Sequence, residues 1–208
     1  MSDYSKSAAR FARNTASHRM TVLHDDGLYR HLRFTNPDSS LYWYEITTTP
    51  GQLVFSGDGD TFAFRVAPDM FEMFRRSAES GGINPQYWAE KCRTGNAYTY
   101  SRDRFEEYVE KQVVSNEPFY PGLRDDVRDE IFDSPVYDVD HEPAAVMTVL
   151  GYEFHLPLGQ NPDRRGPFRF SYVHAWELKD FDWWFLFACH AISDAIVKYD
   201  AARKAVAA

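Results

Sequence analysis

One stretch, from Leu41 to Arg76, constrains the fold more than any other part of this 208-residue chain. Three runs in it alternate apolar and polar residues, a period that places one set of side chains on one face of a β-strand. Two short breaks, Pro50-Gly51 and Gly57-Asp58-Gly59, have the composition of tight turns. The stretch therefore predicts an antiparallel meander whose inward residues are Tyr42, Tyr44, Ile46, Leu53, Phe55, Phe62, Phe64 and Val66.

The period changes to that of a helix after Pro68, so the meander is predicted to run into a helix that covers its apolar face. A longer helix is predicted from Asp180 onward, and its first half is apolar on nearly every side. Such a helix belongs in the centre of a core. Further helices are predicted to begin at Asn84-Pro85, Ser101, Leu123 and Pro143.

Alternating apolar residues also occur outside the meander. The dipeptide Asp26-Gly27 favours a hairpin over residues 20–35, with a helix leading into one strand as the alternative. Two more runs, over residues 152–156 and 168–172, flank a loop rich in proline, glycine and arginine. We expect these two runs to add strands to the same sheet.

Together these patterns predict an α+β fold. We expect an antiparallel sheet of about five or six strands from both halves of the chain, packed by helices, with the long C-terminal helix in the core. The length suits one domain. Residues 1–19 are expected to form a flexible basic tail, and residues 20–208 a single domain with an acidic helical insert at about 101–142.

Composition limits the cellular setting. No apolar run reaches the roughly 18 residues that a membrane-spanning helix needs, and no secretory leader opens the chain. Cys92 and Cys189 lie in apolar, helix-like contexts, which favours reduced core thiols over the alternative of a disulfide. We therefore expect a cytoplasmic protein that does not bind a membrane.

The charge is concentrated in one segment. The net charge of the chain is −8, and residues 101–142 contain 13 acidic and five basic side chains, whereas the rest of the chain is balanced. A protein that binds nucleic acid directly needs a basic surface. We therefore expect no direct contact with nucleic acid.

Candidate chemistry is sparse. His24-Asp25-Asp26 is better explained by a turn than by metal binding, and the cluster Asp138, Asp140, His141 and Glu142 by a solvated acidic loop. Cys189 and His190 are helix neighbours that point about 100° apart, so they cannot form a catalytic pair. Neither a phosphate-binding loop nor a nucleophile elbow is present. We predict no catalytic residue, no metal site and no cofactor.

Several motifs together resemble a family of uncharacterised proteins encoded by tailed phages, prophages and other mobile elements of bacteria. They are YRHLRF near residue 30, YWYEITTTPGQLVFSGDGDTFAF, DMFEMFR, INPQYWAEK and DFDWWFLFACHAISDAIVKYDA. The resemblance covers roughly residues 20 to 202 and is weakest in the acidic middle. It implies a phage accessory protein that acts in the bacterial cytoplasm. Many such proteins inhibit host defence, and anti-CRISPR proteins are among them.

The acidic segment suggests a function. Spaced carboxylates on helices can imitate the phosphates of a duplex and occupy the basic groove of a nucleic-acid-binding partner; a solubilising surface is the alternative. The hypothesis is an inhibitor of a host defence or nucleic-acid-processing complex, present as a monomer or homodimer. Two other functions stay open: a metal-dependent hydrolase or nuclease using His24 or His141, and a dimerising structural protein. The predicted partner-binding residues are Glu106, Glu110, Asp125, Asp126, Asp129, Glu130 and Asp133.

Overall fold

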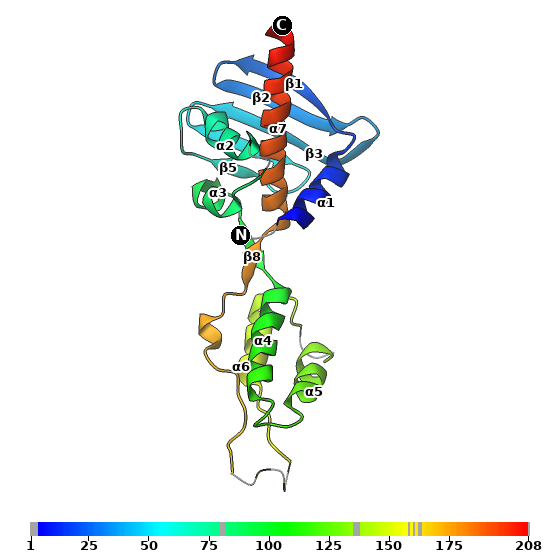
Figure 1. The fold of residues 1–208 in the computed structure, drawn as a ribbon, viewed down its shortest axis with the longest axis vertical. Coiled ribbons are helices and arrows are strands. Elements are labelled where there is room, and N and C mark those ends of the chain that lie inside the picture. Colours follow the sequence, from blue (N-terminus) through cyan, green and yellow to red (C-terminus); the bar gives the residue numbers. More distant parts are fainter. Residues whose placement is uncertain are drawn as a thin grey trace. The chain divides into compact units, whose positions relative to one another are not determined.

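Six antiparallel strands form the main sheet, in the order in which they occur along the chain (Figure 1). Each of the first four pairs with the next through a short turn, as a meander does. The sheet is built entirely from the first half of the chain. The strands are β1 (Arg19–Asp26), β2 (Tyr29–Asn36), β3 (Ser39–Thr49), β4 (Gln52–Gly57), β5 (Phe62–Phe64) and β6 (Cys92–Thr94).

This computed structural model describes residues 4–79, 82–134, 138–157, 159, 161 and 164–207. The chain divides into two compact units: unit 1 comprises residues 1–98 and 181–208, and unit 2 comprises residues 99–180. The sequence had suggested one domain with an acidic insert at about 101–142. The structure differs because residues 143–180 pack with that insert around a hydrophobic core of their own.

The period-two alternation of the meander is confirmed. The side chains of Leu32, Phe34, Tyr44 and Phe55 are almost completely buried. Two of the predicted inward residues differ: Tyr42 is only partly buried, and Val66 is 45% exposed because it lies beyond the end of β5 at Phe64.

Two of the predicted turns, Asp26-Gly27 and Pro50-Gly51, contain a glycine with a positive φ, +60° at Gly27 and +79° at Gly51, which glycine adopts without strain. The hairpin over residues 20–35 is thus correct, and the helical alternative is not.

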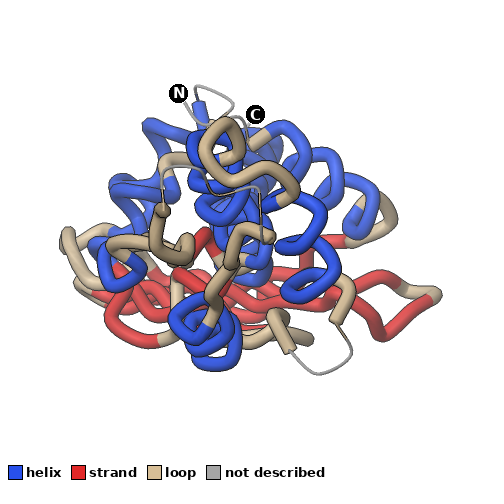
Figure 2. The backbone as a smooth tube through the Cα atoms, turned by 90° about the horizontal axis from the view of Figure 1, so that it is seen from below, coloured by secondary structure: helices blue, strands red, loops and turns tan. Residues whose placement is uncertain are grey.

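Helix α7 (Trp183–Ala207) covers the apolar face of the sheet. Figure 2 shows the strands of unit 1 as one layer, and Figure 1 shows α7 crossing it. The ring of Phe187 lies 5.9 Å from that of Tyr44, and the ring of Phe185 lies 5.4 Å from that of Phe62. Asp182 caps the N-terminus of the helix, because its carboxylate accepts a hydrogen bond from the backbone N–H of Trp184 at 2.7 Å. The predicted α+β class and the central C-terminal helix are confirmed.

Two shorter helices pack in unit 1, α2 (Met70–Glu79) and α3 (Pro85–Lys91). Both begin as the sequence predicts. Asp69 accepts the N–H of Phe71 at 3.0 Å, and Asn84 accepts the N–H of Tyr87 at 3.2 Å. Asp69 also pairs with the buried Arg30 on β2 at 2.9 Å, which ties α2 to the sheet.

The expected flexible tail is, over most of its length, an ordered helix. Helix α1 (Ser5–Thr15) packs on α7: Phe11 is buried with its ring 5.1 Å from that of Phe187, and the hydroxyl of Ser7 lies 2.9 Å from Nε2 of His190. Ser7, Phe11 and Thr15 share one helical face. Arg10 also lies over the ring of Trp183, at 3.7 Å from its centroid. The polar composition of the segment conceals these contacts, since Phe11 is its one large apolar residue.

Unit 2 contains mainly helices: α4 (Arg102–Asn116), α5 (Leu123–Val127), the π-helical turn η1 (Arg128–Phe132), α6 (Glu142–Gly151) and the 3₁₀ turn η2 (Val173–Ala175). The predicted cap is confirmed, because Ser101 accepts the N–H of Arg104 at 3.3 Å. The stripe Leu123, Val127 and Ile131 is buried in the core of this unit. Two short strands, β7 (Tyr98–Tyr100) and β8 (Lys179–Phe181), pair where the chain passes between the units.

The expectation that residues 152–156 and 168–172 add strands to the main sheet is wrong. Among the described residues these segments share a single antiparallel bridge, between Phe154 and Phe168. Their aromatic side chains pack instead in the core of unit 2, where the ring of Tyr152 lies 5.5 Å from that of Phe170. Period-two alternation predicts that one face of a segment is buried, but it does not predict which of the two hydrophobic cores that face packs into.

Both cysteines are free thiols, as expected. Cys189 is fully buried on α7, and burial raises the pKa of its thiol well above the ordinary value. Cys92 is half-buried, and burial raises its pKa as well. Both side chains are therefore protonated near neutral pH.

We predict that Gly59→Ala destabilises unit 1 by about 1–3 kcal/mol through overpacking. A Cβ at Gly59 would lie 2.1 Å from the ring of Trp184, so the indole must move. The measurement is a urea unfolding curve followed by tryptophan fluorescence. Gly82→Ala is the matched control, because a Cβ there meets nothing within 4 Å. Equal midpoints for the two variants would contradict the packing of Trp184 on this turn.

We predict that unit 1 loses stability as the pH falls from about 6.5 toward 4. Burial lowers the pKa of His190 to about 4, so the unfolded chain binds this proton more readily than the folded chain does. Stability from this group is complete above pH 6.5 and declines below it. Burial also lowers the pKa of His18, which acts in the same direction.

The test is thermal unfolding of the wild type and of His190→Gln between pH 7.5 and 4. Glutamine keeps a polar partner for Ser7 but does not titrate, so the decline should be shallower in the variant. Identical pH profiles would show that the environment of His190 is not the cause.

Candidate functional site

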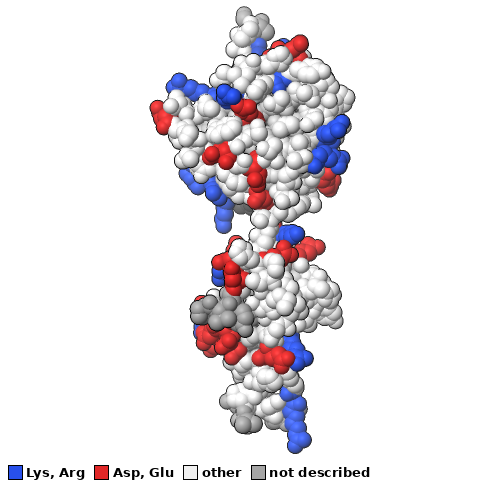
Figure 3. All heavy atoms as spheres, turned by 180° about the vertical axis from the view of Figure 1, so that it is seen from behind, with Lys and Arg blue, Asp and Glu red and all other residues white. Residues whose placement is uncertain are grey.

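Unit 2 contains the whole negative excess of the protein. Residues 99–180 include 17 acidic and nine basic side chains, a net charge of −8, whereas the residues of unit 1 include 14 of each. On the visible face of unit 2, Figure 3 shows several groups of acidic side chains with basic side chains between them. The acidic segment therefore belongs to a compact unit that is itself strongly negative. The charges of this unit create a negative electrostatic potential around it.

The two predicted residues on α4 are paired with arginines of unit 2. Glu106 accepts from Arg102 at 2.8 Å, and Glu110 accepts from Arg124. Arg102 also reaches Asp140 at 2.7 Å. These side chains are largely exposed, and exposed pairs of this kind contribute only about 0–1 kcal/mol each. Most of the charge on this helix is therefore already balanced by arginines of the same unit.

The predicted residues on α5 and η1 divide between two sides of the helix. Asp125 and Asp129 share Arg128, at 3.0 and 3.6 Å. Glu130 and Asp133 have no ion-pair partner among the residues that the structure describes. The seven predicted residues are thus not equivalent, since four carry their own counter-ion.

Asp126 lies on the other side, toward α6. Its carboxylate accepts the phenolic O–H of Tyr152 at 2.5 Å. Burial, together with the carboxylates of Asp126 and Glu130, raises the pKa of Tyr152 far above its ordinary value. The phenol therefore remains a hydrogen-bond donor at every physiological pH and holds the Asp126 carboxylate in place.

The π-helical turn orients this side. The N–H of Asp133 donates to the carbonyl of Arg128 at 2.9 Å, the wider spacing of a π-helix. Ile131 is buried beneath the turn while Glu130, four residues after Asp126, remains at the surface. Such turns occur often at functional positions, because one extra residue per turn redirects the side chains that follow.

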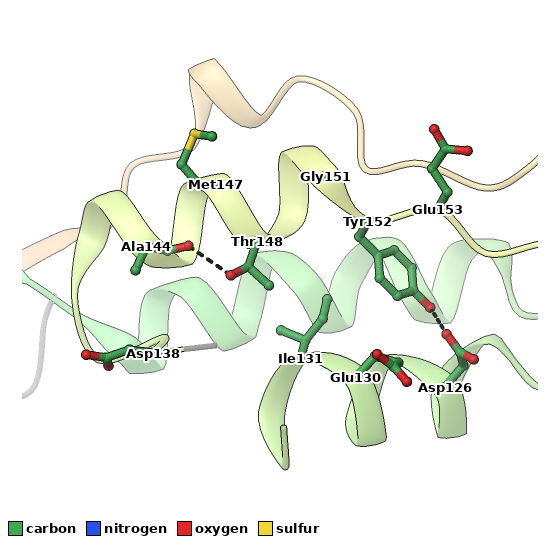
Figure 4. Close-up of a pocket in the computed structure, with 10 residues that line it drawn as sticks. All are labelled: Asp126, Glu130, Ile131, Asp138, Ala144, Met147, Thr148, Gly151, Tyr152 and Glu153. Atoms are coloured by element: carbon green, nitrogen blue, oxygen red, sulfur yellow. Dashed lines mark hydrogen bonds between the residues drawn. The ribbon is translucent and has the colours of Figure 1, made fainter. Parts of the chain in front are cut away.

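A groove of about 620 Å³ separates α5–η1 from α6. Figure 4 shows Asp126 and Glu130 on one side facing Tyr152 and Thr148 on the other, with Asp138 at one end. Its lining is apolar apart from Thr148, Tyr152 and four carboxylates, and it contains no basic side chain among the described residues. The lining residues are Asp126, Glu130, Ile131, Asp138, Ala144, Met147, Thr148, Gly151, Tyr152 and Glu153.

The structure brings together only part of the predicted site. Asp126 and Glu130 line the groove, whereas Glu106, Glu110, Asp125, Asp129 and Asp133 lie outside its lining. The sequence did not reveal Tyr152 or Asp138 as part of it. These two residues come from segments that fold back onto the acidic helix, and no spacing pattern indicates that contact.

The other candidate residues do not form a chemical site. His141 lies 3.5 Å from Asp138 and both are exposed, and His24 is exposed on β1. In the described part of the chain, no group of three or more His, Cys, Asp or Glu side chains is arranged to hold a metal ion. None of the described helices is long and apolar enough to cross a membrane.

Comparisons with known protein families, with curated proteins and with solved structures found no match to this chain. Function is therefore inferred from the geometry and charge of unit 2.

We predict that Tyr152→Phe destabilises unit 2 by about 1 kcal/mol, because it removes the only O–H donor that the described residues supply to the Asp126 carboxylate. Near-ultraviolet circular dichroism during urea unfolding measures the change. Tyr172→Phe is the matched control, since the Tyr172 side chain is 76% exposed. A loss that is no larger for Tyr152→Phe than for the control would contradict the structural role of this hydrogen bond.

Proposed function

We propose that this protein is a non-catalytic binding protein that places the acidic face of unit 2 on a basic surface of another protein. The observation that carries the proposal is the location of charge: unit 2 has a net charge of −8 and unit 1 is neutral. The partner is a bacterial defence complex or another nucleic-acid-processing complex, whose basic site the carboxylates occupy in place of phosphates. The protein is thus an inhibitor of the anti-CRISPR kind that acts in the cytoplasm of the bacterial host.

The choice of partner depends on two kinds of support. Proteins that bind nucleic acid have strongly positive surfaces, and a compact acidic body can occupy such a surface. The bacterial setting is itself part of the proposal and comes from the sequence motifs alone, since no known family matched the chain. Complementary charge would also speed encounter with the partner and make binding sensitive to salt.

The ion pairs within unit 2 are compatible with this role. Because exposed pairs contribute little stability, an arginine of the partner can replace Arg102, Arg124 or Arg128 at small cost. Asp126, Glu130 and Asp133 need no such exchange, since none has a basic ion-pair partner among the described residues. We expect these three carboxylates to contribute most to binding.

In the part of the chain that the structure describes, no grouping of His, Cys, Asp or Glu side chains favours a metal-dependent hydrolase. His24 belongs to unit 1 and His141 to unit 2, and neither has the further ligands that a catalytic metal needs within the described part of the chain. The acidic face remains the best-supported site.

We predict that replacing Asp126, Glu130 and Asp133 together by lysine lowers partner binding about 100-fold or more, since each lysine places like charge against a basic surface. The measurement is recovery of the partner complex in a nuclease-treated pull-down from bacteria with active defence systems.

The matched control replaces three exposed carboxylates of unit 1, Asp38, Asp60 and Glu72, by lysine, which changes the net charge equally. Equal recovery with both triple variants would reject the acidic face of unit 2 as the binding surface. Circular dichroism of each variant checks that it is folded.

A further inference from the structure

The groove between α5–η1 and α6 has a mixed lining in which four carboxylates lie beside apolar residues and no basic side chain is present among the described residues. Asp126 and Glu130 lie four residues apart on one side of the helix and face α6 (Figure 4). Like charges at this spacing destabilise a helix by about 0.2–0.5 kcal/mol. The described residues supply a hydrogen bond from Tyr152 to one of the two carboxylates, but no cation to either.

We propose that this groove binds an arginine side chain from a basic segment of the partner protein. The guanidinium would lie between the carboxylates of Asp126 and Glu130, and the methylene groups of the arginine would pack on Ile131 and the ring of Tyr152. The inference rests on the function proposed above and specifies where on the acidic face the partner is held and by which chemistry.

Three features favour an arginine as the occupant. Its planar group has five N–H donors and no acceptor, so it can bridge two carboxylates while Tyr152 continues to donate to one of them. Its apolar stem suits the lining of Ile131 and Ala144. The cavity of about 620 Å³ is also within the range of sites that enclose a side chain or small ligand.

A divalent cation fits less well. One oxygen of Asp126 already accepts from Tyr152, and Asp138 accepts the N–H of Asp140 at 3.0 Å. Carboxylates fixed in this way do not converge on one point, and no three potential ligands among the described residues are arranged around a common centre.

The surface of α6 indicates what should flank the arginine. Met147 and Leu150 are 68% and 58% exposed, and Met147 also borders the groove. Exposed methionine adapts to varied apolar partners. The partner segment should therefore combine arginine with neighbouring apolar residues.

The test uses a fluorescein-labelled peptide in which two arginines alternate with leucines, titrated with the full chain and followed by fluorescence anisotropy. A second peptide carries citrulline, which has the shape of arginine without its charge. We expect the arginine peptide to bind at least tenfold more tightly than the citrulline peptide.

Two variants target the groove. Glu130→Gln removes one exposed charge, and Gly151→Trp places a large side chain at the lining, where an added Cβ meets nothing within 4 Å. Each should weaken binding of the arginine peptide about tenfold. Glu177→Gln is the matched control: it removes the same charge by the same substitution from an exposed residue of unit 2 outside the lining of the groove, and it should change binding less than twofold.

Equal affinity for the two peptides, equal effects of Glu130→Gln and Glu177→Gln, or undiminished binding by Gly151→Trp would each overturn the inference. Tight binding of calcium alone that Glu130→Gln abolishes would do so too, because it would identify the occupant as a cation. The proposed function has a test of its own. It is contradicted if the triple lysine variant still recovers the partner. If that variant loses the partner while the groove variants keep it, only the arginine site is wrong.

Discussion

The contact between α7 and the apolar face of the six-stranded sheet is the interaction on which the rest of unit 1 depends. The strands contribute an unbroken set of aromatic and aliphatic side chains, and α7 supplies Phe185, Phe187 and the small residues Ala188 and Ala191 against them. Small residues let the helix approach the sheet closely, and large ones fill the space beside them. Helix α1 then packs on α7, so its position depends on this contact as well.

This arrangement leaves unit 2 free to carry charge. The chain leaves unit 1 after Tyr98 and returns at Phe181, and the residues between form a second core around Phe105, Val109 and Phe168. Since unit 1 does not need unit 2 to complete its core, the surface of unit 2 can hold 17 acidic residues. The repulsion among them is reduced by arginines of the same unit, but not at Asp126 and Glu130 in the groove, which have no ion-pair partner among the described residues.

The groove is where local physical rules are not satisfied. Asp126 and Glu130 stand close to each other without a cation, and a π-helical turn interrupts the helix that carries them. Natural sequences usually depart from local consistency at functional positions. A bound arginine of a basic partner would reduce the electrostatic repulsion between these two carboxylates.

Much of the fold could be predicted from the sequence, because it follows from local patterns. Alternation over residues 42–64 identified the buried face, Gly27 and Gly51 marked turns, and Asn84 and Ser101 marked helix starts. The errors came from tertiary contacts. The alternation around Phe154 and Phe168 belongs to another core, and one residue, Phe11, turns an apparently polar tail into a packed helix.

The candidate site was predictable only in part, for the same reason. Composition identified the acidic segment, but it did not reveal which carboxylates have arginine partners. Asp125 and Asp126 are neighbours in sequence, yet the first pairs with Arg128 and the second with Tyr152. The contact with Tyr152 joins residues 26 positions apart and has no local signature.

A competition experiment tests the central claim most directly. The partner complex captured from a nuclease-treated lysate of bacteria with active defence systems would be challenged with its own DNA or RNA substrate. If the acidic face of unit 2 occupies the nucleic-acid site, excess substrate releases this protein, and the two never bind the partner together. A stable complex that contains the partner, its nucleic acid and this protein at once would contradict the account.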